Sequence, residues 1–65
     1  MMKITIDTVL EEQSKTRYWL AQQTGITYPS IMRIANNKST SITFDNLQKI
    51  CIALNCTPND ILQID

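Results

Sequence analysis

The sequence contains a single glycine, Gly25, and it stands four residues before a proline, Pro29, in the stretch TGITYPSIMRI (residues 24–34). Both residue types interrupt helices, yet helix-like apolar spacing continues on either side of them. Gly25 suits a left-handed residue just past one helix, and Thr27 suits the cap of the next. Pro29 then falls in the first helical turn, where a missing backbone N–H costs nothing. The two residues therefore predict two helices joined by a very short turn.

A connection this short prevents the two helices from lying antiparallel, so we expect them to cross at a steep angle. The first helix is predicted over residues 17–24, with a cap at Thr16. The second is predicted over residues 28–36, where Ile31 and Ile34 face inward at a spacing of three. This pair is a helix-turn-helix arrangement.

The clearest helical spacing lies in residues 43–55, behind a cap at Thr43. Apolar side chains recur there at intervals of three and four residues and are predicted to face inward: Phe44, Leu47, Ile50, Cys51 and Leu54. Two shorter helices are predicted at residues 7–13, with Asp7 as the cap, and at residues 57–64.

The two ends of the chain carry a weaker strand signal. Met2, Ile4 and Ile6 alternate with polar residues, as in a short strand, and the segment available to pair with them is ILQID (residues 61–65). We therefore predict an all-α unit of five short helices over residues 1–65, with its ends paired as two short strands. A chain of 65 residues has room for one small core, and a deep substrate cleft is not expected.

Charge is balanced in number but uneven along the chain. Six basic and six acidic residues give a formal net charge of zero, which by itself argues weakly against a nucleic-acid partner. No acidic residue occurs between Lys15 and Lys38, a stretch that also contains Arg17 and Arg33. A positive segment thus coincides with the predicted helix-turn-helix, as in nucleic-acid-binding surfaces. Chance clustering of so few charges is the alternative explanation.

The segment RYWLAQQTGITYPSIMRIANNK (residues 17–38) resembles the helix-turn-helix of the Cro/repressor-type (XRE) family of transcriptional regulators, and the capped helices after it extend the resemblance over nearly the whole chain. The positions that carry it are Leu20, Ala21, Gly25, Ile26, Ile31 and Ile34. Two positions depart from the family's pattern. Asn37 replaces the usual glycine but tolerates a left-handed conformation. Trp19 replaces a glutamate that often completes a capping box, and it either covers the end of the first helix or anchors a partner.

The resemblance implies a lambda-repressor-like fold and a sequence-specific DNA-binding regulator, expected to be a repressor, that inserts the helix at residues 28–36 into the major groove. Four residues share the outward face of this helix and are the expected base contacts: Tyr28, Pro29, Met32 and Arg33. Arg33 is suited to the paired acceptors of guanine. The edges of the same face supply the expected phosphate contacts: Arg17, Thr27, Ser30, Asn36, Lys38 and Thr43. For each residue, an ordinary surface or packing role is the alternative.

One subunit with so few phosphate contacts would bind double-stranded DNA feebly, so we expect a homodimer on a two-fold operator, with recognition helices about 34 Å apart. The last helix and the terminal strands are the expected dimer surface. The main alternative function is a protein-interaction or antitoxin-like module on the same scaffold. Zero net charge and four side chains expected at the surface keep that alternative open: Tyr18, Trp19, Tyr28 and Met32.

Other classes of function lack a motif. The sequence has no histidine and no glycine-rich phosphate loop, so we expect no enzymatic activity, cofactor, metal or small-molecule effector. Cys51 and Cys56 are expected to be reduced packing residues, with a redox pair or a metal site as the alternatives. We expect a cytoplasmic protein, because no apolar run approaches the roughly 20 residues of a membrane helix and the first residues, MMKITID, lack the apolar core of an export signal.

Overall fold

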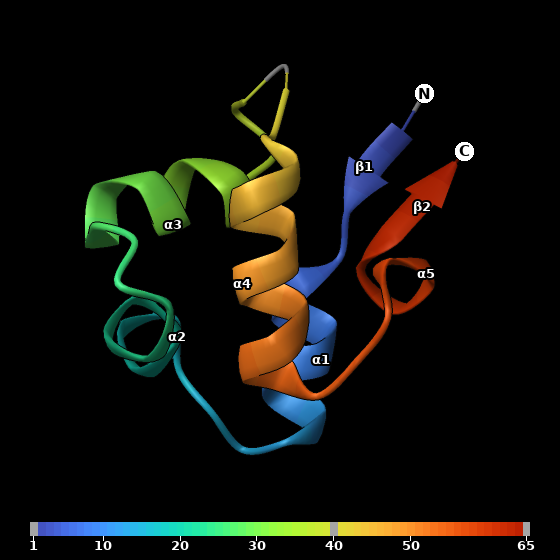
Figure 1. Ribbon diagram of the computed structural model, residues 1–65. Coiled ribbons are helices and arrows are strands. Elements are labelled where there is room, and N and C mark those ends of the chain that lie inside the picture. Colours follow the sequence, from blue (N-terminus) through green and yellow to red (C-terminus); the bar gives the residue numbers. More distant parts are fainter. Residues whose placement is uncertain (1, 40, 65) are drawn as a thin grey trace.

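Helices dominate the computed structural model, which describes residues 2–39 and 41–64 (Figure 1). The elements of these parts follow in the order β1 (Met2–Ile4), α1 (Ile6–Glu12), α2 (Arg17–Thr24), α3 (Tyr28–Ala35), α4 (Phe44–Leu54), α5 (Pro58–Ile61) and β2 (Leu62–Ile64). The predicted class, five short helices with paired ends, is confirmed. None of the described helices has the length and apolar character needed to cross a bilayer.

α4 is the central support of the fold. Figure 1 shows α2 and α3 on one side of it and α1 and α5 on the other. Each helix contributes at least one side chain to a single aliphatic core, whose fully buried members are Ile6, Leu20, Ile31, Ile50, Leu54 and Ile61. Burying a side chain of this kind contributes about 1.5–3 kcal/mol. No polar or charged side chain of the described residues is buried, so the core fixes the helices by apolar packing.

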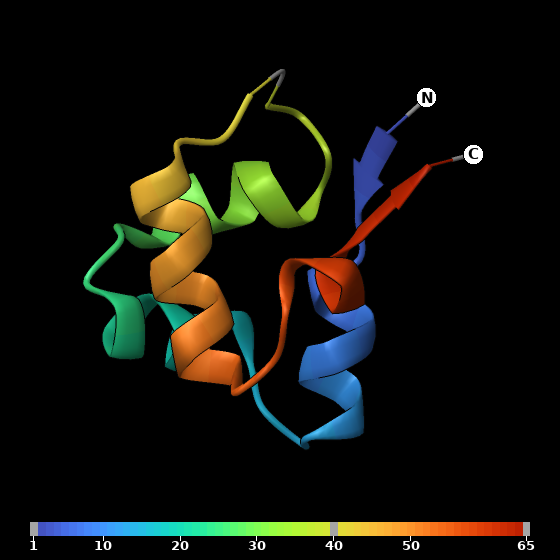
Figure 2. The same ribbon diagram turned by 45° about the vertical axis from the view of Figure 1, so that its right-hand side comes forward.

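β1 and β2 bring the two ends of the chain together as an antiparallel ribbon (Figure 2). Met2 lies opposite Ile64 in the register, which confirms the predicted pairing. Asp65, the last residue of the predicted second strand, lies outside the described residues. The first strand is shorter than its alternating pattern suggested. Ile6 opens α1 instead, because its side chain is fully buried in the helical core.

Asp7 is not the cap of α1, contrary to the prediction. Thr5 occupies the cap position, and its backbone N–H donates to the carbonyl of Ile61 at 2.8 Å. This bond and the burial of Ile6 place the start of the helix earlier in the chain than the sequence suggested. Asp7 lies in the first turn, and its carboxylate is directed to Arg17.

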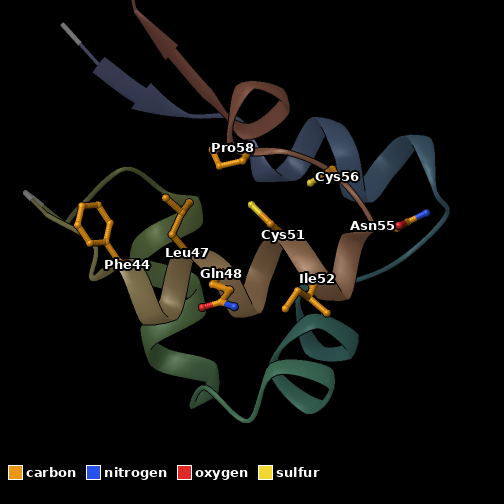
Figure 3. Close-up of a pocket in the computed structure, with 8 residues that line it drawn as sticks. All are labelled: Phe44, Leu47, Gln48, Cys51, Ile52, Asn55, Cys56 and Pro58. Carbon is orange, nitrogen blue, oxygen red and sulfur yellow. The ribbon is translucent and has the colours of Figure 1, made fainter.

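Phe44 is also wrongly predicted, because it does not face the core. Its side chain is 89% exposed, whereas Ile50, Cys51 and Leu54 of the same apolar row are buried and Leu47 is half-buried. The physical reason is position: Phe44 is the first residue of α4, and Figure 3 shows its ring projecting outward at that end of the helix. Correct helical spacing therefore did not guarantee burial at the end of the helix.

The short connection between α2 and α3 has the predicted geometry. Gly25 follows α2 with a left-handed φ of +75°, and its backbone N–H donates to the carbonyl of Ala21 at 3.0 Å. Thr27 occupies the N-cap position of α3, and Tyr28 and Pro29 are its first two residues. Figure 1 looks along α2 but views α3 from the side, so the two helices cross steeply. The helix-turn-helix arrangement is confirmed.

Candidate nucleic-acid interface

α3 separates an apolar side from a polar side. Ile31, Ile34 and Ala35 are buried against the rest of the fold. Tyr28 and Arg33 are exposed on the outward side of the helix. The buried side packs α3 against the rest of the fold, and the opposite side is open to a ligand. Of the four predicted base contacts, Tyr28, Pro29 and Arg33 are exposed and Met32 is half-buried.

Tyr28 is supported from α2. Its ring meets the ring of Tyr18 edge to face, with centroids 6.1 Å apart and an interplanar angle of 63°. Such aromatic pairs add about 0.5–1.5 kcal/mol beyond simple area burial. Tyr28 nevertheless remains 44% exposed, so the contact orients the ring and leaves its outer part free.

Arg17 joins three helices through its guanidinium group. Its Nε donates to Asp7 Oδ1 at 2.9 Å, and its Nη2 donates to Asp7 Oδ2. Nη2 also donates to the side-chain oxygen of Asn36 at 3.0 Å, and Nη1 donates to the sulfur of Met32 at 3.2 Å. We call Asp7, Arg17, Met32 and Asn36 the Arg17 cluster. It brings together three predicted DNA-contacting residues and one acid, Asp7, whose contact with Arg17 the sequence did not predict.

Within the Arg17 cluster, Asp7 and Arg17 each stabilise the charged state of the other. Hydrogen bonds from Arg17 hold the pKa of the Asp7 carboxyl below its usual range, and partial burial opposes that shift. The same bonds to Asp7 raise the pKa of Arg17. The charge of Arg17 is therefore matched by Asp7 in this structure, and its phosphate contact stays a prediction.

The cap of α3 differs in detail from the expected one. Thr27 is at the N-cap position, but its side chain accepts no hydrogen bond from the first-turn backbone. Its hydroxyl donates instead to the Ser30 hydroxyl at 2.9 Å. The two predicted phosphate contacts Thr27 and Ser30 thus lie side by side at the positive end of α3, where backbone N–H groups attract anions.

The end of α3 is fixed by Asn37, which adopts a left-handed φ of 59° as expected for the residue that replaces glycine. Its side-chain oxygen accepts from the N–H of Ile4 at 2.6 Å, and its side-chain amide donates to the carbonyl of Ile4 at 3.1 Å. This link between α3 and β1 had no sequence signal. The backbone N–H of the exposed Lys38 donates to the carbonyl of Arg33 at 2.9 Å, which keeps Lys38 close to α3.

A polar hollow of about 250 Å³ lies between α3 and the start of α4. Thr43 is confirmed as the cap of α4, since its hydroxyl accepts from the N–H of Asn46 at 3.1 Å. The hollow brings together three predicted site residues, Ser30, Arg33 and Thr43. The sequence analysis missed its further polar residues, which are Ser39, Ser41 and Asn46. The run of hydroxyl residues before the helix cap is the signal that could have indicated Ser39 and Ser41.

Arg33 and Lys38 form no ion pair with any described residue. The ion pairs between described residues join Arg17 to Asp7 and Lys49 to Asp45. Arg33 and Lys38 thus differ from Arg17, whose charge is matched inside the protein. The outward side of α3 and its C-terminal end therefore present positive charge that no ion pair among the described residues matches.

Trp19 and the two cysteines have packing roles in the structure. Trp19 is half-buried against the core, and the Lys15 ammonium lies 4.9 Å from the centre of its ring. Cys51 is buried and Cys56 is half-buried, and both are free thiols. Burial raises the pKa of the Cys56 thiol to about 11. Among the described residues, no group of three or more histidine, cysteine or acidic side chains could hold a metal ion.

Comparison with known proteins identifies one matching family, one sequence relative and one similar solved structure. Residues 5–65 match the family of Cro/C1-type HTH DNA-binding domains. The chain is 35% identical over 60 residues to YozG of Bacillus subtilis strain 168, an uncharacterized HTH-type transcriptional regulator, with 92% of this chain and 71% of YozG covered. A crystal structure of a candidate DNA-binding protein from Bacteroides fragilis is also similar, with a TM-score of 0.85 and 36% identity over 97% of this chain and 100% of that one.

The family match covers nearly the whole chain, including α2, the Gly25 turn and α3. The chain therefore belongs to the Cro/C1-type (XRE) family of helix-turn-helix transcriptional regulators.

Proposed function

We propose that this Cro/C1-type domain is a sequence-specific transcriptional repressor that binds double-stranded DNA by inserting α3 into the major groove. The observation that carries the proposal is the two-sided character of α3: Tyr28 and Arg33 are exposed, while Ile31 and Ile34 on the opposite side are buried. In helix-turn-helix proteins, the second helix of the motif reads base edges in this way. The proposal treats residues 1–65 as one DNA-binding unit in the cytoplasm, without catalytic activity.

Base recognition falls mainly to Arg33 in this proposal. Its guanidinium forms no ion pair with the described residues, so it is free to donate two hydrogen bonds to O6 and N7 of guanine. Tyr28 offers a hydroxyl, and its ring is already oriented by Tyr18. Pro29 offers apolar surface to a thymine methyl group. Met32 is half-buried, and its sulfur accepts from Arg17, so it has less surface to offer than Pro29.

Phosphate recognition is proposed for residues on two sides of α3. Thr27 and Ser30 flank its first turn, whereas Lys38 and Thr43 lie beyond its end. Each phosphate that a cation neutralises contributes about −0.9 to the slope of log affinity against log salt concentration. Arg17 is proposed to contact phosphate only by exchanging its bond to Asp7 for a bond to DNA, and the same exchange would release Asn36.

A homodimer on a two-fold operator completes the proposal. Two recognition helices about 34 Å apart would contact successive major grooves on one face of the duplex. Two half-sites double the number of base and phosphate contacts and raise affinity above that of one small domain. A dimer seated over a promoter would repress transcription by covering the DNA that polymerase needs.

Selection of bound duplexes from a random DNA pool is the decisive test. We expect enrichment of a short inverted repeat with a guanine in each half-site, followed by salt-dependent binding of that duplex in fluorescence anisotropy. Enrichment of no sequence, with weak binding to every duplex, would contradict specific recognition by α3. A stable complex with another protein and no affinity for DNA would instead favour the interaction-module alternative.

A further inference from the structure

The end of α4 brings the two cysteines of the chain together. Asn55 follows the helix with a left-handed φ of 52°, and its backbone N–H donates to the carbonyl of Ile52 at 3.2 Å. The next backbone N–H, that of Cys56, donates to the carbonyl of Cys51 at 3.0 Å. These two bonds form a Schellman motif, in which the residues joined by the longer loop commonly pack their side chains together. In α4 those two residues are Cys51 and Cys56.

The same motif follows two further helices, α1 and α3, but joins no thiols there. The N–H of Lys15 donates to the carbonyl of Leu10 at 2.8 Å, and the N–H of Lys38 donates to the carbonyl of Arg33 at 2.9 Å. A left-handed residue stands before each lysine. The motif is therefore a general way in which this chain ends a helix. The turn after α4 differs because the motif joins two side chains that can react with each other.

The two thiols also influence each other's protonation. Burial raises the pKa of both, that of Cys56 to about 11. A hydrogen bond between the side chains opposes this shift at Cys51 and adds to it at Cys56, as expected when Cys56 donates and Cys51 accepts. The fold thus holds two neutral thiols together, which react slowly but have their sulfur atoms already paired.

A hollow of about 600 Å³ gives small molecules access to the pair (Figure 3). Both cysteines line it, together with Pro58 at the start of α5, and its lining contains no charged residue. Figure 3 shows the two sulfur atoms in the space between α4 and the segment that leads into α5. Cys51 is buried and Cys56 is half-buried, so Cys56 is the thiol that a reagent meets first. The volume is within the range of about 300–1,000 Å³ for pockets that enclose small molecules.

We propose that Cys51 and Cys56 form a reversible thiol-modification site, at which a small neutral disulfide, RSSR, converts the pair into an intramolecular disulfide bond. The reaction takes two exchange steps. In the first, the Cys56 sulfur loses its proton and attacks one sulfur of RSSR, so a Cys56–SR bond forms, the reagent's S–S bond breaks and RSH leaves. In the second, the Cys51 sulfur loses its proton and attacks the Cys56 sulfur, which releases a second RSH. Two thiols thus lose two electrons, and RSSR gains them.

Other uses of the pair have less support in the structure. A structural metal site of the zinc type takes four ligands. Among the described residues, no third histidine, cysteine or acidic side chain joins Cys51 and Cys56 in a group that could hold a metal ion. The packing role of the two side chains depends on their volume and leaves their thiol chemistry unused. Oxidation to a disulfide needs no group beyond the two sulfur atoms and the reagent.

The disulfide would connect the last turn of α4 to the residues that lead into α5. A crosslink removes conformational freedom from the unfolded chain and so stabilises a fold that accommodates it. No residue of α2 or α3 lines the hollow, so Tyr28 and Arg33 stay uncovered by the reaction. We therefore expect oxidation to raise stability and to leave DNA binding unchanged. The proposal does not depend on the proposed function, because the thiol reaction is measured without DNA.

The test is intact-protein mass spectrometry after the reduced protein is incubated with hydroxyethyl disulfide in mildly alkaline buffer. The wild type should lose two hydrogen atoms, stay monomeric and accumulate little mixed disulfide, because Cys51 attacks the mixed disulfide at Cys56. Cys51→Ala is the matched variant and should accumulate that mixed disulfide instead. Cys56→Ala should react more slowly, since its remaining thiol is buried. The oxidised wild type should melt at least about 4 °C above the reduced form, and dithiothreitol should reverse both changes.

Four results would overturn the proposal. Accumulation of mixed disulfide in the wild type, as in Cys51→Ala, would mean that the thiols do not meet. A covalent dimer would assign the oxidation to separate chains. A wild type that reacts only in denaturant would show that the folded hollow excludes the reagent. An oxidised form that melts below the reduced form would show that the fold does not accommodate the bond. The wild type alone decides among these results, so the test survives a variant that fails to fold.

Discussion

The guanidinium of Arg17 and the carboxylate of Asp7 form a bidentate ion pair that joins the start of α2 to the first turn of α1. The carboxylate sits where a DNA phosphate would sit if Arg17 were a phosphate ligand, because both groups offer oxygens to the same N–H donors. If Arg17 contacts DNA as proposed, Asp7 and a phosphate compete for one cation. The sequence suggested an unopposed positive segment, and the fold adds an acid to it from α1.

We predict that Asp7→Asn increases the affinity for DNA of any sequence. The substitution keeps the size of the side chain and removes the charge that competes with phosphate. Release of Arg17 should steepen the slope of log affinity against log salt by about 0.9 per subunit. Fluorescence anisotropy over a salt series measures both quantities. Glu12→Gln is the matched control, since it removes the same charge from an exposed position on the same helix. An equal gain in the control would attribute the effect to net charge alone.

Acid should remove the stabilisation that the Asp7–Arg17 pair provides. The pKa of Asp7 is lower in the folded protein than its ordinary value of 3.8. The contribution to the free energy of unfolding is therefore complete above that ordinary value and is lost as the pH falls through the lower, folded value. Because the Asp7 side chain is 51% exposed and solvent screens the pair, we expect less than about 1 kcal/mol. Denaturant unfolding of the wild type and Asp7→Asn should differ near neutral pH and converge in acid. A difference that grows on acidification would contradict this assignment.

Arg33→Ala should cost about 1–3 kcal/mol of binding free energy on the selected operator and relax the preference for guanine. The melting temperature should hardly change, because the side chain is exposed and makes no ion pair with described residues. Competition between the operator and a duplex with that guanine replaced measures the loss of specificity.

Lys38→Ala is the contrasting control for this prediction. Lys38 is proposed to contact phosphate, so its removal should weaken binding to both duplexes alike and flatten the salt dependence. If Arg33→Ala also lowered the affinity for both duplexes equally, Arg33 would be a phosphate contact and not a base contact.

Cap residues and the spacing of apolar residues within single helices were sufficient to predict most of the fold. Thr16 and Thr43 were predicted caps, and each accepts a hydrogen bond from the backbone three residues later. Ile31 and Ile34 were predicted to be buried, and both are. In each case the information lies in the spacing along one helix or in the residue type at its end.

The remaining features depend on where separate elements meet. Phe44 has the correct helical spacing, but it is the first residue of α4, where its ring stays 89% exposed. Asp7 reaches Arg17, and Asn37 reaches Ile4, across gaps in sequence that no periodic pattern spans. The candidate site was therefore predicted as a list of exposed residues on α3 and its flanks. The internal partner of Arg17 became visible only in the fold.

Gly25→Val should destabilise the fold by about 1–2 kcal/mol, the cost of a left-handed conformation for a residue with a Cβ atom. The φ of Gly25 is +75°, and a Cβ built there has no neighbouring atom within 4 Å. The Cβ atom itself therefore meets no neighbour, and the expected loss comes from the left-handed backbone. Gly25→Asn is the matched variant, because Asn37 and Asn55 already adopt φ values of 59° and 52° in this chain. Thermal unfolding should rank the wild type first, Gly25→Asn close behind and Gly25→Val last. Equal losses in both variants would mean that the turn tolerates no side chain at this position, whatever that residue's preference for a left-handed backbone.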